Sequence, residues 1–501
     1  MFLFLNLVIF FFLTPFIIDV LGPARAGIWF LLGSITGYFG IVAFGIPGAT
    51  EKYVAEYLAN DDRDQVNRIV SSSLFLSLWL AVIAAAAAAA LCVFVDDVFR
   101  VGREHLIEAR WVMIIIGIDL ALAYPCALMF NVLKGFNRYD VRNAILIPAL
   151  LVKAGGYYLA LTSGGGVTAM VLVQLVVNLL GYLAATLWVR HQAPWLRVSL
   201  RARDRNVSRL VLVYGAFQFV AMAADRIILH TDRIIVASMV TMAGVTVYHL
   251  AAQLRNQGRQ FSSGLTMALR PAASHLHALG DYANLQKLLI IGGRIMLVAL
   301  GGLYVLYATW GDRFIHLWQY GLTKQDADVA YTCLMILIAP TFLTVALGPG
   351  VAIMYGMARH KPFGLLGLVV AIVNVGLSIW LARLIGIYGV AIGTAVPLFF
   401  IRGLYMYYYF PHITRMSPWR FIAGAWGRPL MGLVPLAAAM IVLRLTLRFD
   451  RLLWLMVFFA AVGCAYVAWV YLVVLTPEEK RLVHEIASGR SFKTGTEDTD
   501  S

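Results

Sequence analysis

Charged residues are scarce in this chain, and their scarcity argues against a soluble protein. They make up 13% of the 501 residues, whereas a soluble domain carries about 25%. Hydrophobic residues account for 61% and gather in long runs separated by short polar segments. No soluble core is needed to explain this composition. The sequence therefore predicts an all-α polytopic membrane protein.

Cysteine and recognisable catalytic motifs are scarce as well. The four cysteines all fall inside apolar runs without a pairing pattern, so we expect no disulfide framework. The sequence has no Gly-x-x-x-x-Gly-Lys-Ser/Thr loop, which excludes ATP as the direct energy source, and no Gly-x-Ser-x-Gly elbow. His275 and His277 lack the further Cys or His residues that a zinc site needs. We therefore predict neither a metal site nor a cofactor.

A large external loop is also missing. The longest predicted outside loop spans 311–328. Nothing in the sequence organises its Asp312, Asp326 and Asp328 as catalytic carboxylates. A membrane glycosyltransferase or polymerase acting on lipid-linked sugar would present such carboxylates in a substantial external loop. We therefore expect that the chain is not an enzyme, and an enzyme of this kind is the weaker alternative.

Apolar runs of about 20 residues are long enough to cross a bilayer as helices. The first run lacks a basic n-region and is followed by Gly-Pro, so we expect a retained helix rather than a signal peptide. The boundary at 230–232 is the least distinct, because charged residues interrupt the apolar pattern on both sides. The fourteen predicted spans are 1–21, 27–48, 69–95, 111–133, 144–162, 167–189, 210–229, 233–254, 288–310, 329–357, 363–383, 389–410, 429–446 and 452–475.

The net charge of +14 is explained by how Lys and Arg are distributed between the loops. With both termini in the cytoplasm, the inside loops hold 25 of the 40 Lys and Arg residues and the outside loops hold 10. This asymmetry is the positive-inside pattern of multi-pass membrane proteins. It favours membrane lipids over nucleic acid as the partner of the basic residues.

Landmarks in the first half of the chain recur in the second half at a nearly constant offset. Segment 27–62 is matched by 244–281, and 134–138 is matched by 355–359. Such a shift indicates an internal duplication. With six spans in each copy, the copies enter the membrane in the same orientation, as parallel repeats. The predicted organisation is an N-terminal six-helix bundle with a cytoplasmic linker (1–209), a C-terminal six-helix bundle (210–428), two additional transmembrane helices (429–475) and a cytoplasmic tail (476–501).

Several basic residues lie inside the predicted spans, where each costs about 2.5–3.5 kcal/mol at the bilayer centre. Lys153 is mid-span and Arg402 lies in the inner half of its helix, so we expect both to line a wet cavity. Arg226 is a further cavity candidate. Arg294 is close enough to the cytoplasmic end for its guanidinium to snorkel, and lining the cavity is the open alternative.

Polar side chains form stripes on the sixth and seventh spans. Gln174 and Asn178 share one helix face, and Gln218 and Asp225 share another. Such stripes serve either as interhelical glue or as the lining of a polar cavity. Because these stripes lie beside basic residues, we favour the interpretation that they line a polar cavity. The acids Asp119 and Asp225 are candidates for ion coupling, and a structural ion pair is the open alternative for Asp119.

Segments in both halves resemble the Wzx-type polysaccharide or O-antigen flippases of the multidrug/oligosaccharidyl-lipid/polysaccharide (MOP) exporter superfamily. The likeness extends from the first span to about Tyr409. The motifs are mainly structural, so they indicate the superfamily better than the substrate. The matching segments are Leu-Thr-Pro-Phe-Ile-Ile-x-x-Leu-Gly-Pro (13–23), Ala-Gly-Ile-Trp (26–29), Tyr-Val-Ala-Glu-Tyr (53–57), Thr-Asp-Arg-Ile-Ile (231–235), Leu-Arg-Pro (269–271) and Leu-Gly-Asp (279–281).

This resemblance implies two six-helix bundles around a cationic cavity and alternating access. It implies flipping of undecaprenyl-diphosphate-linked oligosaccharide across the bacterial inner membrane, for cell-surface polysaccharide or lipopolysaccharide biosynthesis. A polysaccharide polymerase and other assembly proteins are candidate partners. The physical argument agrees, because each close pair between a basic residue and the diphosphate contributes about 4 kcal/mol at an effective dielectric of 20.

Two alternatives remain open. An ion-coupled multidrug antiporter of the same superfamily would depend on Asp119 or Asp225. A structural subunit of a polysaccharide export complex would tolerate the loss of every buried charge.

Overall fold

The chain is almost entirely helical in its computed structural model, and the described residues contain no β-strand. This confirms the predicted all-α class. The structure describes residues 2–43, 45–99, 101–359, 361–477 and 479–480.

The chain forms two compact units, which we call unit 1 and unit 2. Unit 1 comprises Met1–Gln253, Gln319–Leu337 and Lys361–Leu398. Unit 2 comprises Leu254–Trp318, Ile338–His360 and Phe399–Ser501.

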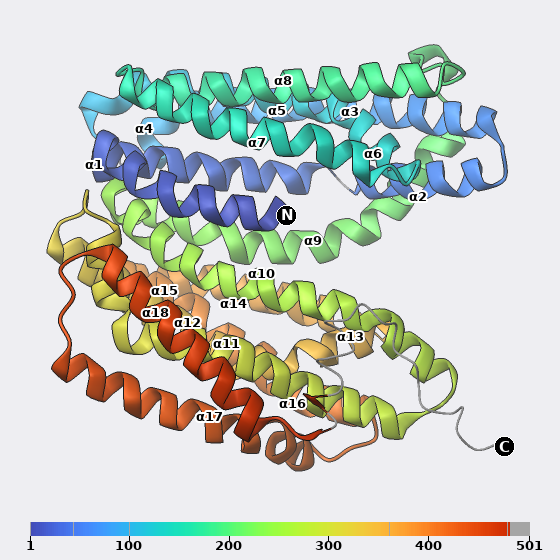
Figure 1. The fold of residues 1–501 in the computed structure, drawn as a ribbon. Coiled ribbons are helices and arrows are strands. Elements are labelled where there is room, and N and C mark those ends of the chain that lie inside the picture. Colours follow the sequence, from blue (N-terminus) through green and yellow to red (C-terminus); the bar gives the residue numbers. More distant parts are fainter. Residues whose placement is uncertain (1, 44, 100, 360, 478, 481–501) are drawn as a thin grey trace. The chain divides into compact units, whose positions relative to one another are not determined.

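Unit 1 is built from long apolar helices that pack side by side (Figure 1). α5 (Leu106–Cys126) packs on α3 (Arg63–Val93) and α8 (Gly166–Gln192), and α8 also packs on α7 (Tyr139–Thr162). α1 and α14 both pack on α9. The other helices that lie wholly in unit 1 are α1 (Phe2–Val42), α2 (Ile46–Ala59), α4 (Val95–Val98), α6 (Leu128–Gly135), α9 (Arg205–Met239), α14 (Lys361–Ile385) and α15 (Ile387–Pro397).

Two further helices, α10 (Met242–Ala278) and α12 (Lys324–Thr344), begin in unit 1 and end in unit 2. The helices that lie wholly in unit 2 are α11 (Tyr282–Trp318), α13 (Gly348–Gly356), α16 (Leu404–Ile413), α17 (Pro418–Thr446) and α18 (Leu452–Trp469).

α1 contains two of the predicted spans. Its backbone leaves helical geometry at Gly22, where φ is 74° and ψ is 163°, and the following Pro23 cannot donate a helix hydrogen bond. Figure 1 draws α1 as two dark-blue helical arms. A straight helix over Leu5–Gly40 would be roughly 54 Å long at 1.5 Å per residue, well beyond a hydrocarbon core of about 30 Å. The bend therefore turns one apolar stretch into two segments of spanning length.

Eleven helices in the described part of the chain are long and apolar enough to cross a membrane. They cover twelve of the fourteen predicted spans, because α1 holds two of them. The two predicted spans at 210–229 and 233–254 are outside this set. They correspond to α9 and α10, whose charged residues lower the mean hydropathy.

The predicted break at 230–232 is wrong. α9 continues through it to Met239, and the actual break lies at Val240–Thr241. Thr241 caps the start of α10: its hydroxyl accepts a hydrogen bond from the amide of Gly244 at 2.9 Å, as an N-cap residue does. The predicted inside loop at 255–287 is also mostly helix, because α10 extends to Ala278.

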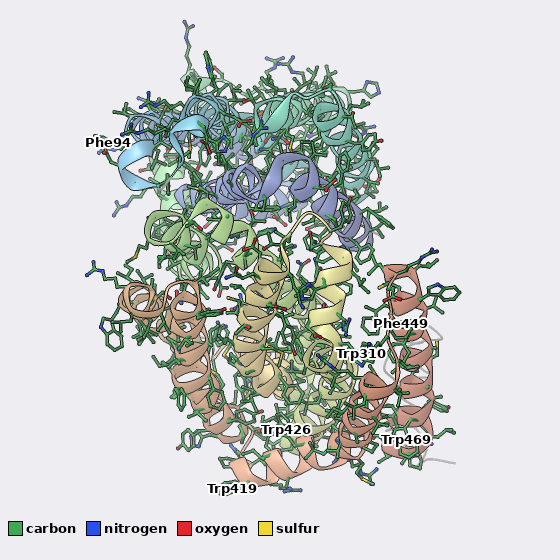
Figure 2. The ribbon with its side chains drawn as sticks, turned by 90° about the vertical axis from the view of Figure 1, so that its left-hand side faces the viewer. Phe94, Trp310, Trp419, Trp426, Phe449 and Trp469 are labelled. Carbon is green, nitrogen blue, oxygen red and sulfur yellow. The ribbon has the colours of Figure 1, made fainter. Side chains whose placement is uncertain are left out.

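Unit 2 packs α17, α18 and α13 on its longest helix, α11. Trp310 of α11 is buried against Phe449 and Phe458, with ring centroids 5.6 and 5.1 Å apart, and its indole N–H donates to the carbonyl of Met440 at 3.1 Å. Figure 2 shows Phe449 beside Trp310. This aromatic contact joins α11 to α17 and α18.

Two segments that recur in the sequence fold into matching turns. Asp61 and Gly280 both have left-handed backbone, with φ of 51° and 68°. The next residue, Asp62 or Asp281, caps the following helix through its carboxylate at 3.0 Å. Its own amide donates to the carbonyl five residues earlier, at 3.0 Å in both turns. Hydrogen bonds from the backbone and side chain of Asn284 lower the pKa of Asp281 below its ordinary value.

The second recurring pair behaves in the same way. Asn137 and Ala358 have φ of 56° and 55°. The arginine that follows each of them donates its amide to the carbonyl five residues earlier, at 2.9 Å in both turns. The sequence duplication is therefore accompanied by a duplication of local backbone geometry.

Candidate functional site

Unit 1 contains a cavity of about 340 Å³, which we call the polar cavity. Side chains from α1, α5, α7, α8, α9 and α10 line it. Apolar residues of α1 form much of its wall. The polar and aromatic residues that matter below are Trp29, Tyr157, Gln174, Arg233, His249 and Gln253.

Arg233 supplies a positive charge to this cavity. Its guanidinium lies 3.1 Å from Nδ1 of His249 and 3.2 Å from Nδ1 of His230. Because arginine only donates hydrogen bonds, both ring nitrogens act as acceptors. A histidine that accepts at Nδ1 carries its proton on Nε2 and is neutral. Phe30 stacks on His249 at a centroid distance of 3.9 Å and fixes the orientation of that ring.

A hydrogen-bonded network joins α5, α7 and α8 next to the cavity. The buried carboxylate of Asp119 accepts from Gln174 at 3.0 Å and from Asn178 at 2.9 Å. Asn178 accepts in turn from Lys153 at 2.7 Å. Gln174 accepts from the hydroxyl of Tyr157 at 3.3 Å. The network holds Gln174 and Tyr157 in fixed positions at the cavity wall, and it places an acid near the ammonium group of Lys153.

A second buried carboxylate belongs to Asp232, which directly precedes Arg233 on α9. Asp232 is 3% exposed and accepts hydrogen bonds from Tyr248 at 2.6 Å and from Thr394 at 2.8 Å. Thr394 accepts from the amide nitrogen of Asn374 at 2.7 Å, and the buried Asn374 Oδ1 has no hydrogen-bond partner among the described residues. This group of hard oxygen atoms around a carboxylate is suited to a proton or a small cation.

Four of the residues selected from the sequence come together. Gln174 lines the polar cavity itself. Lys153, Asn178 and Asp119 lie behind it and reach it through the network. The side chain of Gln218 lies outside the part of the chain that the structure describes.

The other candidates make none of the hydrogen bonds described for this network. Asp225 is exposed and Arg226 is half-buried on α9. Arg402 is half-buried in a π-helical turn at Leu398–Gly403 of the chain. Arg294 in unit 2 pairs with Glu479 at 3.0 Å, and the side chain of Glu479 is 1% exposed. Most of the predicted tail after Glu479 lies outside the described residues.

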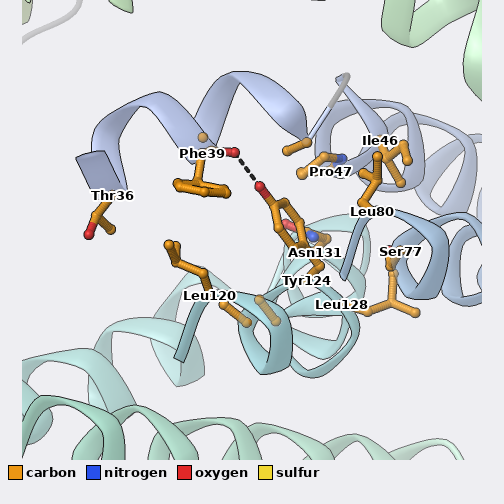
Figure 3. A pocket seen from close by; sticks show the side chains of 14 residues that line it. Thr36, Phe39, Ile46, Pro47, Ser77, Leu80, Leu120, Tyr124, Leu128 and Asn131 are labelled. Atoms are coloured by element: carbon orange, nitrogen blue, oxygen red, sulfur yellow. Dashed lines mark hydrogen bonds between the residues drawn. The ribbon is translucent and has the colours of Figure 1, made fainter. Parts of the chain in front are cut away.

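A second, mostly apolar cavity of about 230 Å³ lies beside the break between α1 and α2. Figure 3 shows Tyr124 at its centre, with Leu120 on one side and Pro47 and Ile46 on the other. The hydroxyl of Tyr124 donates to the carbonyl of Phe39 near the end of α1. The bond satisfies a backbone group where the helix stops. Nothing charged lines this cavity, which suits a hinge or a hydrocarbon chain better than an anion.

Sequence reasoning missed Arg233 and His249. Because the helix break was expected at 230–232, Arg233 fell at the very start of a predicted span, and neither Arg233 nor His249 was selected as a cavity residue. Two signals in the sequence point to the correct break. Thr241 is a good N-cap residue, and the duplication places the start of the recurring segment at Gly244. Within the described residues, no group of three or more His, Cys, Asp or Glu side chains has the geometry to hold a metal ion.

Comparison with known proteins gives one curated relative and a consistent fold. No family model matches the chain. The uncharacterized membrane protein EpsK of Bacillus subtilis (strain 168) is 20% identical over 485 residues, which cover 94% of this chain and 93% of EpsK. The chain is thus similar over nearly its full length to another membrane protein.

The similar solved structures are transporters and a flippase. An inward-facing multidrug resistance MATE family transporter of the MOP superfamily aligns with a TM-score of 0.65 and 16% identity, covering 81% of this chain and 94% of the transporter. The lipid II flippase MurJ, in an inward closed conformation, aligns with a TM-score of 0.64 and 14% identity, covering 96% of this chain and 100% of MurJ. A MOP superfamily transporter from Pyrococcus furiosus aligns with a TM-score of 0.59 and 14% identity, covering 82% and 94%.

These alignments define the class of the chain. It is a multi-pass membrane protein with the fold of the MOP-superfamily transporters. This is the fold expected for the superfamily that the sequence motifs resemble. The identities are too low to carry a substrate from any of these proteins to this one.

Proposed function

We propose that this protein flips an undecaprenyl-diphosphate-linked oligosaccharide across the bacterial inner membrane by alternating access. The observation that carries the proposal is the polar cavity of unit 1, which presents Arg233 beside two neutral histidines. A diphosphate crossing hydrocarbon needs a counter-charge, and an arginine offers a forked donor set that matches phosphate oxygens. The transporter fold and the relatives among flippases support the same function.

The surroundings of the cavity fit this cargo in two further ways. Gln174, Gln253 and Tyr157 provide the polar groups that a hydrated sugar needs along its path. The prenyl chain can remain in lipid, because it gains nothing from a polar cavity. Lys153 and Arg402 are proposed to contribute further positive charge on the transport path, and both chain termini are proposed to be cytoplasmic.

The test is flipping by purified protein in proteoliposomes that contain a fluorescent prenyl-diphosphate-linked sugar. Arg233→Gln is expected to lower the flipping rate at least about 100-fold, which corresponds to 2.7 kcal/mol, while Arg233→Lys keeps part of it. Arg190→Gln, on the exposed end of α8, is the matched control and keeps the wild-type rate. Wild-type flipping by Arg233→Gln would show that the cavity does not carry the diphosphate.

An ion-coupled multidrug antiporter is the second candidate, and the buried carboxylates favour it. Asp119 and Asp232 are 4% and 3% exposed, and each is held by neutral hydrogen-bond donors, as a site for a proton or a small cation requires. In this case Asp119→Asn or Asp232→Asn abolishes drug efflux driven by an ion gradient, and Arg233→Gln leaves efflux intact. The two functions therefore predict opposite results for Arg233→Gln.

A further inference from the structure

We infer that the polar cavity has a sugar-binding end, in which Trp29 and Tyr157 hold one pyranose ring next to the phosphate group that Arg233 binds. This inference rests on the proposed function and deepens it. It concerns the part of the cavity that carries no charge.

The wall at this end is aromatic and rigid. Trp29 of α1 and Tyr157 of α7 both line the cavity and meet edge to face, with ring centroids 5.2 Å apart and an angle of 75°. The faces of aromatic rings carry negative potential, which attracts the positively polarised C–H groups on one face of a pyranose. Tyr157 is fixed by its bond to Gln174, and Gln174 by its bond to Asp119. Binding of a sugar therefore costs little conformational entropy in the side chains of this wall.

Two polar groups in the cavity match sugar hydroxyls. A hydroxyl both donates and accepts hydrogen bonds, and a side-chain amide offers both a donor and an acceptor. Gln253 lines the cavity and makes no hydrogen bond that the described residues reveal. The indole N–H of Trp29 likewise has no hydrogen-bond acceptor within the described part of the chain. Both groups are available to a ligand.

The size of the cavity limits what it can hold. Its volume of about 340 Å³ is at the lower end of the 300–1,000 Å³ that ligand pockets usually have. This is room for a sugar ring and a phosphate group. Together with Arg233 and His249, which line the same cavity, these residues give a site with the chemistry of a glycosyl phosphate.

The inference is tested by calorimetric titration of the full chain in detergent micelles. The probes are inorganic phosphate, α-D-glucose 1-phosphate and N-acetyl-α-D-glucosamine 1-phosphate. At least one hexose phosphate is expected to bind about tenfold more tightly than phosphate, a gain of 1.4 kcal/mol. Trp29→Ala removes this gain and leaves phosphate binding unchanged, whereas Arg233→Gln weakens both. Trp79→Ala, at an exposed position of α3, is the matched control.

Two variants protect the test against misfolding. Trp29→Phe keeps an aromatic face and retains part of the gain, and Tyr157→Phe keeps the ring while losing the bond to Gln174. The inference is overturned if neither hexose phosphate exceeds inorganic phosphate, or if the gain survives Trp29→Ala. If phosphate binding depends on Arg233 but neither hexose phosphate binds more tightly than inorganic phosphate, this inference is refuted and the proposed function is not. Binding that is independent of Arg233 contradicts the proposed function as well.

A last titration distinguishes the two sources of a glycosyl phosphate. The probe is farnesyl-diphosphate-linked N-acetylglucosamine, compared with the soluble sugar phosphate in the same micelles. Tighter binding of the farnesyl compound supports a lipid-borne cargo. Tighter binding of the soluble sugar phosphate overturns the lipid-borne assignment.

Discussion

Two arginines inside helices, one in each unit, have different partners. Arg294 in unit 2 meets the carboxylate of Glu479 at 3.0 Å. Arg233 in unit 1 meets the neutral rings of His230 and His249 beside a cavity. The guanidinium of Arg294 is matched to a carboxylate, whereas the guanidinium of Arg233 contacts two imidazole rings at the wall of a cavity. The contrast separates a cation paired with a distant acid from one that lines a cavity and is proposed to bind an anionic cargo, although both look alike in the sequence.

The largest effect is expected when the pair in unit 2 is broken. Glu479→Gln leaves the half-buried Arg294 without its counter-charge; breaking a fully buried pair costs about 3–5 kcal/mol, and we expect the lower end, about 3 kcal/mol. Equilibrium unfolding in detergent micelles measures this loss. The neighbouring Lys480→Gln is the control. Combining Arg294→Met with Glu479→Leu is expected to recover most of the stability, because no uncompensated charge remains. An unchanged unfolding free energy for Glu479→Gln would remove the contrast between the two arginines.

The close approach of α1 to α10 in unit 1 gives the next effect. A Cβ at Gly27 would clash with the carbonyl oxygen of Met242, whereas a Cβ at Gly33 on the same helix has no atom within 4 Å. Gly27→Ala is therefore expected to cost about 3 kcal/mol, the upper end for overpacking. Gly33→Ala gains up to about 1 kcal/mol of helix propensity. Equal unfolding free energies for the two variants would contradict this helix contact.

The network behind the polar cavity gives a smaller effect. Asp119→Asn removes a charged acceptor from two amides and is expected to destabilise the protein by about 2 kcal/mol. Asp225→Asn, at an exposed position, changes stability by less than about 0.5 kcal/mol. The same unfolding measurement compares the two. If Asp225→Asn has the larger effect on both stability and transport, the protein depends on the carboxylate of Asp225 rather than on the buried carboxylate of Asp119.

The smallest effect compares the recurring turns. Ala358 has φ of 55°, where a Cβ costs about 1–2 kcal/mol, and Asn137 occupies the matching position with φ of 56°. Ala358→Gly relieves the strain but adds entropy to the unfolded chain, so a net gain of about 0.5 kcal/mol is expected. Asn137→Ala is expected to lose a similar amount. A loss of stability in Ala358→Gly would show that the two turns differ in the forces that hold them.

Much of the site followed from residue type and spacing. Gln174 and Asn178 lie one turn apart on α8, so both reach the same neighbour, and a buried acid such as Asp119 needs donors nearby. The spacing of four residues predicted that Gln174 and Asn178 share a face. Their contact with Asp119 was not predicted, because the sequence gives Asp119 only as an ion-coupling candidate or a partner for a basic residue. The position of Arg233 at the cavity was not predicted. It depends on where α9 ends, and the charged residues near 230 suggested a loop there. In the structure Asp232 and Arg233 have hydrogen-bond partners inside unit 1, and the helix continues through them to Met239.

Arg294 illustrates the opposite limit. Its depth in the helix left snorkelling and cavity lining equally open, and nothing near it in the sequence names a partner. Glu479 lies 185 residues further along the chain. Only the packing of distant segments brings the two together, and local patterns carry no information about such a contact.

Composition and periodicity by themselves determined the membrane-spanning, all-helical class and the duplicated turns, because burying apolar helices in lipid and capping their ends are local requirements of the chain. The tertiary structure alone decided which buried charges are neutralised and which line a cavity. That outcome depends on the distance between side chains on different helices, which no single stretch of sequence encodes.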